Sequence, residues 1–380
     1  MVPMNETPQF HPALLPSGLR DVLPPEAELE ARSITAIMDC FAAYGYERVN
    51  PPVLEFEDSL FSGSGAATSD QAFRLMDPES QRMMALRVDT TPQIARLATT
   101  RLADAPRPLR LAYAGQCLRV RGSHLQPERQ IAQAGIELIG NDTAEADAEI
   151  ILTAVAALAT IGLTSLSVDL TIPRLVPELL EGLDATQKAQ IAHALDRKDA
   201  AAVAALGGTP LLQQLLTASG AAERGVPALL AIALPGEAKA QVLRLAATVA
   251  AIRRVQPNLP LTVDPVEFRG YQYHTGVCMT LFAPGRQAEL GRGGRYICGQ
   301  AEPATGITLY PDTIIRLAPS PALRQRIYIP HGTPSARAVE CRTQGFATIA
   351  GLAPLAEPAA EARHLGCSHI FLDGTITPLG

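Results

Sequence analysis

Hydrophobic and polar positions alternate most clearly at 111–140, where the pattern predicts two strands joined by a polar loop. The outgoing strand is mostly apolar and ends at Arg119. In the return strand, Gln133, Gly135 and Glu137 occupy every second position, so they point to one face of the strand. The other face carries only apolar residues: Ala132, Ala134, Ile136 and Leu138.

The polar face of the return strand has two interpretations. An arginine, a glutamine and a glutamate that converge on one surface suit a small zwitterion. A carboxylate binds an ammonium group, and an arginine binds a carboxylate, through charge-assisted hydrogen bonds. The alternative is a solvated sheet face with an incidental ion pair. The two strands alone leave both interpretations open.

The chain before these strands predicts an N-terminal helix followed by short elements. Apolar residues at helical spacing, with Pro24 and Pro25 in the first turn, predict a helix to about Ala43, and Gly45 ends it. The other elements predicted here are a strand at 46–50, a Gly/Ser-rich loop at 58–69, a hairpin formed by 71–77 and 82–88, and a helix at 93–102.

The amino-acid composition changes after these strands. A helix is predicted at 144–161, capped by Asp142 or Thr143. Residues 173–260 are rich in Ala and Leu and punctuated by Gly and Pro, which indicates a helical insertion. The remaining predictions are strands at 166–170, 261–268 and 273–283, a loop at 289–296, a short strand and helix to 317, and a three-stranded α/β unit. We therefore expect two domains, residues 1–317 and 318–380.

Composition and charge exclude several classes of protein. The hydrophobic fraction of 47% allows a large core, and the net charge of −6 gives no general attraction for a phosphate backbone. No apolar run reaches the ~18 residues that a membrane span needs. The N-terminus lacks the pattern of a signal peptide. We expect a cytoplasmic protein that binds neither nucleic acid nor membrane.

Metal and cofactor chemistry also lack a signal in the sequence. None of the cysteines forms a CxxC pair, and no histidine pair has metal-ligand spacing supported by a cysteine or carboxylate. No P-loop, nucleophile elbow or dinucleotide-binding fingerprint is present. The sequence therefore predicts no metal and no cofactor.

The order and spacing of these segments resemble the class II aminoacyl-tRNA synthetases, specifically the histidyl branch. Residues 15–27 and 44–55 resemble the first motif, which builds the dimer interface in that family. Residues 119–137 resemble the second motif, 269–277 (RGYQYHTGV) the histidine-recognition loop, and 291–296 (GRGGRY) the Gly-Gly-Arg-Tyr turn. The resemblance implies an α+β fold, a class II synthetase-like antiparallel sheet flanked by helices, with a helical insertion and a short C-terminal α/β unit.

The resemblance also implies a histidine-binding site. Asp89 and Thr91, expected on one face of a strand, match residues that hold the amino group, although the family usually has Glu in place of Asp89. The other implied contacts are Gln133 and Glu137 around the ammonium and imidazole groups, Arg269 and Arg119 at the carboxylate, and Tyr273 near the ring. His274 replaces a second tyrosine of the family pattern, and its role is open.

Each of these residues also has a purely structural interpretation. Asp89 and Thr91 fit a helix cap before Pro92. Arg269 fits a surface turn, and Tyr273 fits a core strand. Together, their positions favour the binding site over these separate explanations.

The nucleotide-binding part of the family pattern is lost. Where the family has a Glu two residues after the arginine of the second motif, this chain has Arg121, and Pro127 stands where a basic loop residue is expected. In the third motif, Tyr310 replaces the glycine that lets ATP approach, and Thr313 replaces the arginine. Because such groups stabilise a transition state together, we expect no adenylation. Phosphate binding by Arg316, three residues later, is the alternative.

An amino-acid site without nucleotide machinery is similar to one family, the regulatory subunits of ATP phosphoribosyltransferase. The resemblance implies a subunit without catalytic activity that joins the short-form catalytic subunit in a hetero-octamer. It implies a requirement for full activity in the first step of histidine biosynthesis, feedback inhibition by histidine, and self-association through the first motif. The alternatives are an active histidyl-tRNA synthetase or other histidine-adenylating ligase, and a paralogue with another partner.

Overall fold

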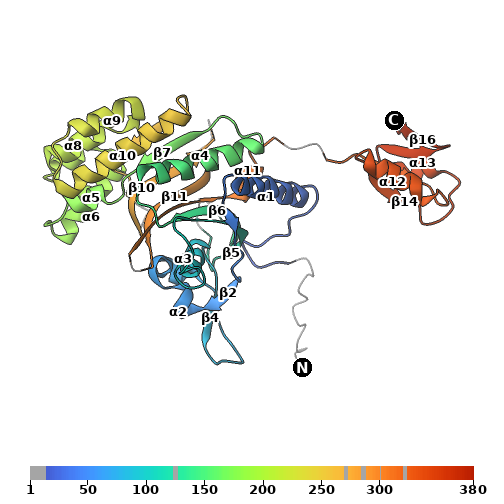
Figure 1. Cartoon of the computed structure of the whole chain (residues 1–380), viewed down its shortest axis with the longest axis horizontal. Coiled ribbons are helices and arrows are strands. Elements are labelled where there is room, and N and C mark those ends of the chain that lie inside the picture. The colour runs from blue at the N-terminus through green and yellow to red at the C-terminus, as the bar shows by residue number, and fades with distance from the viewer. Residues whose placement is uncertain (1–13, 123–126, 269–272, 284–287, 300, 320–322) are drawn as a thin grey trace, which may run out of the picture. The chain divides into compact units, whose positions relative to one another are not determined.

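The computed structural model describes residues 14–122, 127–268, 273–283, 288–299, 301–319 and 323–380 (Figure 1). The chain divides into two compact units, Met1–Pro319 and Ser320–Gly380. The larger unit contains a wide twisted sheet with helices on it, and the smaller unit has a sheet of its own.

The large sheet has the strand order β1-β5-β6-β12-β11-β10-β7-β9-β8 in the described residues. Its pairs are antiparallel except β1 with β5 and β7 with β9. The strands are β1 Glu47–Arg48, β5 Leu109–Leu118, β6 Gln130–Ile139, β7 Ser167–Thr171, β8 Gly220–Ala221, β9 Leu261–Asp264, β10 His274–Phe282, β11 Glu289–Cys298 and β12 Glu302–Leu309. The predicted strand pair is confirmed as β5 and β6, which pair along their whole lengths.

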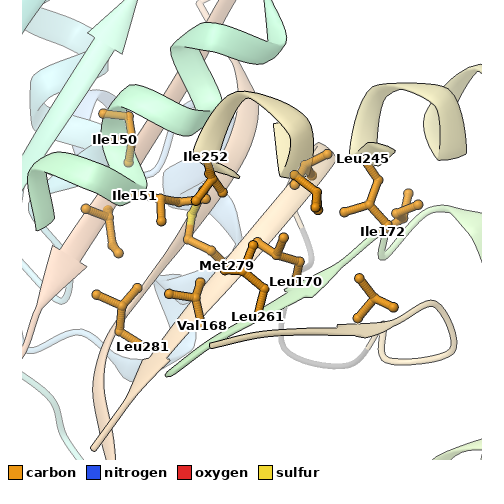
Figure 2. Close-up of a cluster of buried hydrophobic side chains, with 14 of the residues drawn as sticks. Ile150, Ile151, Val168, Leu170, Ile172, Leu245, Ile252, Leu261, Met279 and Leu281 are labelled. Carbon is orange, nitrogen blue, oxygen red and sulfur yellow. The ribbon is translucent and has the colours of Figure 1, made fainter. Parts of the chain in front are cut away.

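One face of this sheet packs on helices α1 (Glu26–Ala43), α4 (Ala144–Thr160) and α10 (Gly236–Val255). Figure 2 shows the core between them: Ile150 and Ile151 of α4 and Leu245 and Ile252 of α10 meet strand residues such as Leu170 and Met279. Ala134, Ile136 and Leu138 of β6 belong to this core, as their alternation predicts. The polar positions of β6 therefore lie on the opposite face of the sheet.

The helix boundaries follow local signals in the sequence. Helix α4 begins at a Thr143 cap, whose hydroxyl accepts a hydrogen bond from the Ala146 N–H at 3.3 Å, so Thr143 and not Asp142 is the cap. Helix α1 ends just before Gly45, which has a φ of +82°. This left-handed conformation favours glycine and reverses the chain into β1.

The opposite face of the sheet carries α3 (Thr91–Thr99) and a smaller apolar cluster that includes Ile94, Leu111 and Tyr113. A second sheet with the order β2-β4-β3 lies in the same unit, and its strands are β2 Leu54–Phe56, β3 Arg74–Met76 and β4 Met83–Leu86. It contains the predicted hairpin, β3 with β4, which is confirmed.

Three local predictions are wrong. Residues 58–69 are not a loop, because helix α2 (Glu57–Leu60) and the 3₁₀ helix Gly63–Gln71 occupy them. Ser and Thr side chains close these turns; the Thr68 hydroxyl donates to the Gly65 carbonyl at 3.0 Å. Asp89 and Thr91 do not lie on a strand, because Thr91 already begins α3 with Pro92 in its first turn. The segment 289–296 is not a loop but most of β11.

The segment between β7 and β9 is helical, as the Ala- and Leu-rich pattern predicts. Its helices before α10 are α5 Leu175–Leu179, α6 Ala185–Asp196, α7 Ala200–Ala205, α8 Pro210–Thr217 and α9 Ala222–Ala231. Their buried leucines, alanines and valines extend the main core beyond the sheet. Helix α11 (Pro311–Ile315) then follows β12.

The C-terminal unit has four strands in the described residues, in the order β14-β13-β15-β16, and not the three predicted. The missed strand, β16 (Thr375–Pro378), pairs antiparallel with β15 (His369–Leu372). The turn between them is Asp373-Gly374, and both residues have positive φ, the conformation of a tight hairpin turn. The other elements are β13 Arg326–Ile329, α12 Ser335–Thr343, β14 Ala347–Ala350 and α13 Pro358–His364.

Candidate ligand-binding site

Glu137 of β6 is the centre of a buried polar cluster on the face of the sheet opposite the helical core. Its side chain is 1% exposed and accepts hydrogen bonds from the Thr91 hydroxyl at 2.9 Å and the Tyr296 hydroxyl at 3.0 Å. Burial raises the pKa of Glu137 to about 8, the two hydroxyl donors oppose this rise, and the negative charge of Asp89 adds to it. A buried carboxyl group that is held by two hydroxyl donors can bind a cationic or N–H-bearing ligand.

The strand register places glycines beside Glu137. Gly306 of β12 pairs with Glu137, and Gly294 of β11 pairs with Gly306. A Cβ atom on Gly306 would collide with the Glu137 carboxylate, and one on Gly293 would collide with the Gly306 carbonyl. Glycine is therefore needed here for close packing of backbone against side chain, which explains a glycine-rich segment inside a strand.

These glycines line part of a small pocket, with a cavity volume of about 10 Å³. Its polar and aromatic walls are Thr91, Glu137, Tyr273, His274, Arg292, Tyr296 and Thr308. The walls come from α3 and from strands β6, β10, β11 and β12, or, for Tyr273, from the residue before β10, so only the assembled sheet creates the pocket.

Gln133 joins the cluster to Asp89. Its side-chain oxygen accepts hydrogen bonds from the Thr90 N–H at 3.1 Å and the Thr90 hydroxyl at 2.9 Å. Its amide nitrogen donates to Asp89 Oδ1 at 3.2 Å, and the Thr91 N–H donates to the same oxygen at 3.4 Å. Asp89, Thr91, Gln133 and Glu137 thus lie in one neighbourhood, although the Asp89/Thr91 backbone is the start of a helix.

Tyr113, an aromatic residue that the sequence did not single out, also belongs to the cluster. The Tyr113 hydroxyl lies 2.7 Å from the Thr308 hydroxyl and 3.4 Å from that of Thr91. Gly135 allows this position, because a Cβ there would collide with the Tyr113 ring. The signal that could have found Tyr113 is its two-residue spacing from Leu111 and Gly115 on β5, whose partners are Glu137 and Gln133.

Tyr273 and His274 form an aromatic wall. Their rings stack with centroids 4.3 Å apart, and Tyr273 meets the edge of Tyr296 at 6.0 Å. Burial and the positive charge of Arg292 lower the pKa of His274 to about 3, so this imidazole is neutral. Tyr273 is therefore a pocket residue, and His274, whose role was left open, lies beside it in the same pocket.

Of the two arginines predicted to bind the carboxylate, the structure describes only Arg119. Arg119 follows β5, and its buried Nε atom has no hydrogen-bond partner within the described residues. Arg269 lies outside the described residues. Arg292, which the sequence did not single out, lines the pocket and pairs with Glu289 at 3.2 Å.

The residues at the lost nucleotide motifs have other partners or face solvent. Arg121 is exposed. Arg316 pairs with Glu128 at 2.8 Å and is 55% exposed. Asp312, beside Thr313, accepts a hydrogen bond from the Ala132 N–H at 2.8 Å and so ties α11 to β6. Arg316 is therefore paired with the Glu128 carboxylate, where nucleotide binding would require it to meet a phosphate.

Two further features bear on the kind of protein. Among the described residues, no group of three or more His, Cys, Asp or Glu side chains is arranged to hold a metal ion. None of the helices in that part of the chain combines the length and apolar character that a membrane crossing requires.

The fold and the site define a class II synthetase-like protein of the histidyl branch, and comparisons with known proteins agree. The family model for histidyl-tRNA synthetase matches residues 18–314. A crystal structure described as an ATP phosphoribosyltransferase regulatory subunit/histidyl-tRNA synthetase from Bacillus halodurans superposes with a TM-score of 0.78 at 23% identity, covering 95% of this chain and 97% of that one. The predicted fold class is confirmed.

Relatives with higher identity narrow the assignment. The ATP phosphoribosyltransferase regulatory subunit of Paramagnetospirillum magneticum is 53% identical over 94% of this chain and 95% of its own length. That of Gluconobacter oxydans is 50% identical over 99% of both chains. The chain belongs to the family of ATP phosphoribosyltransferase regulatory subunits, which the sequence motifs had indicated.

Proposed function

We propose that this regulatory subunit of histidine biosynthesis binds free histidine in the pocket at Glu137 and so adjusts the activity of an ATP phosphoribosyltransferase catalytic subunit. The observation that carries the proposal is the buried Glu137 carboxyl group, which has two hydroxyl donors and lines one pocket with Gly293, Gly294 and Gly306. Asp89, Gln133 and Glu137 would meet the ammonium and imidazole groups. Arg119, with its unpartnered Nε, and Arg269 would meet the carboxylate.

The partner we propose is the short-form catalytic subunit, joined in a hetero-octamer. The relatives are named as regulatory subunits of that enzyme, which supports a non-catalytic role for this chain. Self-association through α1 and β1 is supported by the position of β1 at the end of the large sheet, where Glu47 and Arg48 are exposed. An exposed edge strand can pair with another copy.

Reconstitution with the catalytic subunit tests the proposed function. The full chain should co-purify with a short-form ATP phosphoribosyltransferase, raise its activity, and make that activity sensitive to histidine. Calorimetry should show histidine binding by the full chain. A chain that binds the catalytic subunit but leaves it insensitive to histidine, and that shows no calorimetric binding, would contradict the histidine-sensing role.

Histidine-dependent ATP–pyrophosphate exchange should be undetectable, which separates this function from the ligase alternative. Arg121 and Thr313 replace the expected nucleotide contacts, Tyr310 replaces the glycine that lets ATP approach, and Arg316 is paired with Glu128. Loss of one such contact costs about 3 kcal/mol of transition-state stabilisation, and here several are missing. The assay needs a histidyl-tRNA synthetase as positive control, and exchange by this chain at a comparable rate would establish the alternative.

Histidine binding should release a proton near neutral pH. In the free protein the pKa of Glu137 is about 8, so at pH 7 this group is mostly protonated, whereas a cationic ligand requires the carboxylate. Affinity should therefore rise with pH up to about 8 and then level off. Calorimetry in two buffers of different ionisation enthalpy should give about one proton released per histidine at pH 7. Proton uptake would show that the carboxylate is not what the ligand meets.

A further inference from the structure

Tyr310 lies on the same sheet face as the proposed histidine pocket. Gly306 and Thr308 of β12 both line that pocket, and Tyr310, with φ −111° and ψ 88°, continues the pairing of β12 with β11 by one residue beyond Leu309. Side chains two residues apart on an extended chain point to one face, so Tyr310 continues the row of Gly306 and Thr308. Its backbone N–H donates to the Leu290 carbonyl at 2.9 Å, which holds this residue against β11.

The neighbours of Tyr310 show which end of the candidate site it lies near. By register, Gly306 stands beside Glu137 and Thr308 beside Gly135, so the next position in the row stands near Gln133. The charges of Glu289, Arg292, Asp89 and Arg119 all act on the Tyr310 hydroxyl. Tyr310 therefore lies at the Asp89 and Arg119 end of the site, away from Glu137.

We propose that the Tyr310 side chain closes the Arg119 end of the pocket and restricts its ligand to a free amino acid, excluding amino acids with a bulky group on the carboxyl carbon. This inference rests on the proposed function, because it assumes that histidine binds with its carboxylate toward Arg119. A tyrosine side chain fills a large volume, and here it sits where a substituent on the carboxyl group would have to leave the pocket.

The physical basis of the selection is steric and therefore distinct from charge recognition. Arg119 would bind the carboxylate, and an ester or amide would lose that interaction in any variant. The tyrosine ring adds a second penalty that depends on the size of the substituent. Because the charge contribution to the ratio of the two affinities is the same in every variant, comparing this ratio between variants cancels it and isolates the steric contribution.

The test compares L-histidine and L-histidine β-naphthylamide by calorimetry in the full-length protein and its Tyr310→Gly, Tyr310→Ala and Tyr310→Phe variants. The ratio of the two dissociation constants should fall at least about tenfold in the glycine and alanine variants, because the naphthyl group gains space. It should stay unchanged in Tyr310→Phe, whose ring fills the same space. Such a gain of binding cannot result from misfolding.

The outcomes separate this inference from the proposed function. If the unmodified protein binds histidine but the ratio is the same in all variants, Tyr310 does not close the pocket and only this inference fails. If the unmodified protein does not bind histidine, the proposed function fails and the inference fails with it. A fall in the ratio for Tyr310→Phe as large as for Tyr310→Gly would also overturn the steric argument.

Discussion

Replacing Glu137 with glutamine is expected to lower histidine affinity by about two orders of magnitude or more. Glutamine keeps the size and shape of the side chain but removes the charge that a ligand ammonium or imidazole N–H group would meet. Removing one partner of a buried charge-assisted pair typically costs about 2–5 kcal/mol. Isothermal titration calorimetry measures the change, and phosphoribosyltransferase activity of the reconstituted complex should lose its response to histidine.

The matched control for this variant is Glu79→Gln, an exposed glutamate in the turn between β3 and β4. It removes the same charge from the chain and should leave histidine affinity unchanged. Glu137→Gln should still associate with the catalytic subunit, since a residue that is only 1% exposed offers almost no surface for a partner to contact. Feedback inhibition that persists at wild-type strength in Glu137→Gln would rule out this pocket as the sensor.

The same substitution should stabilise the ligand-free protein at alkaline pH. Burial raises the pKa of Glu137 from 4.5 to about 8, so this group contributes its full stability only below about pH 4.5 and loses it as pH rises through 8. A glutamine does not ionise, so the free energy of unfolding of the variant should exceed that of wild type by up to about 5 kcal/mol above pH 8. Lost binding together with a higher Tm would distinguish a functional residue from a structural one.

The sequence predicted the β5–β6 part of the site because its signals are local. The two-residue alternation of Gln133, Gly135 and Glu137 requires only one strand, and the structure places these residues on the face opposite the helical core. Tyr113, Arg292 and Thr308 were missed because the register of β5, β11 and β12, which no single segment specifies, brings Arg292 and Thr308 to the pocket and Tyr113 to the cluster beside it.

Two of the wrong local predictions, those at 289–296 and at Asp89 and Thr91, have separate physical causes. The glycines of residues 289–296 favour a loop by intrinsic propensity, but Gly293 and Gly294 are needed where β11 passes close to its neighbours, so tertiary packing overrides propensity. Asp89 and Thr91 were expected on one strand face because they match family residues at a two-residue spacing, with a helix cap before Pro92 as the alternative. In the fold, Pro92 in the first turn of α3 begins a helix instead.

The buried ion cluster around Asp147 is the other place where a single change should have a large effect. Asp147 of α4 is fully buried and accepts hydrogen bonds from Arg295 of β11 at 2.8 and 3.0 Å and from Arg244 of α10 at 3.1 Å. Arg295 also donates to the carbonyls of Asn141 and Thr143 at the start of α4. The cluster therefore joins helices α4 and α10 to β11, the strand that carries Tyr296.

Replacing Asp147 with alanine should lower the free energy of unfolding by about 3–5 kcal/mol, because the buried Arg295 guanidinium loses its buried carboxylate partner. The control is Glu145→Ala on the same helix, whose ion pair with Arg254 is 63–66% exposed and should therefore contribute little to stability. Thermal and urea unfolding measure the stability of both variants.

The Asp147 variant should also bind histidine more weakly at temperatures where it is still folded, because Tyr296, which follows Arg295, donates a hydrogen bond to Glu137. Equal stability losses in the two variants would show that the buried cluster does not anchor β11.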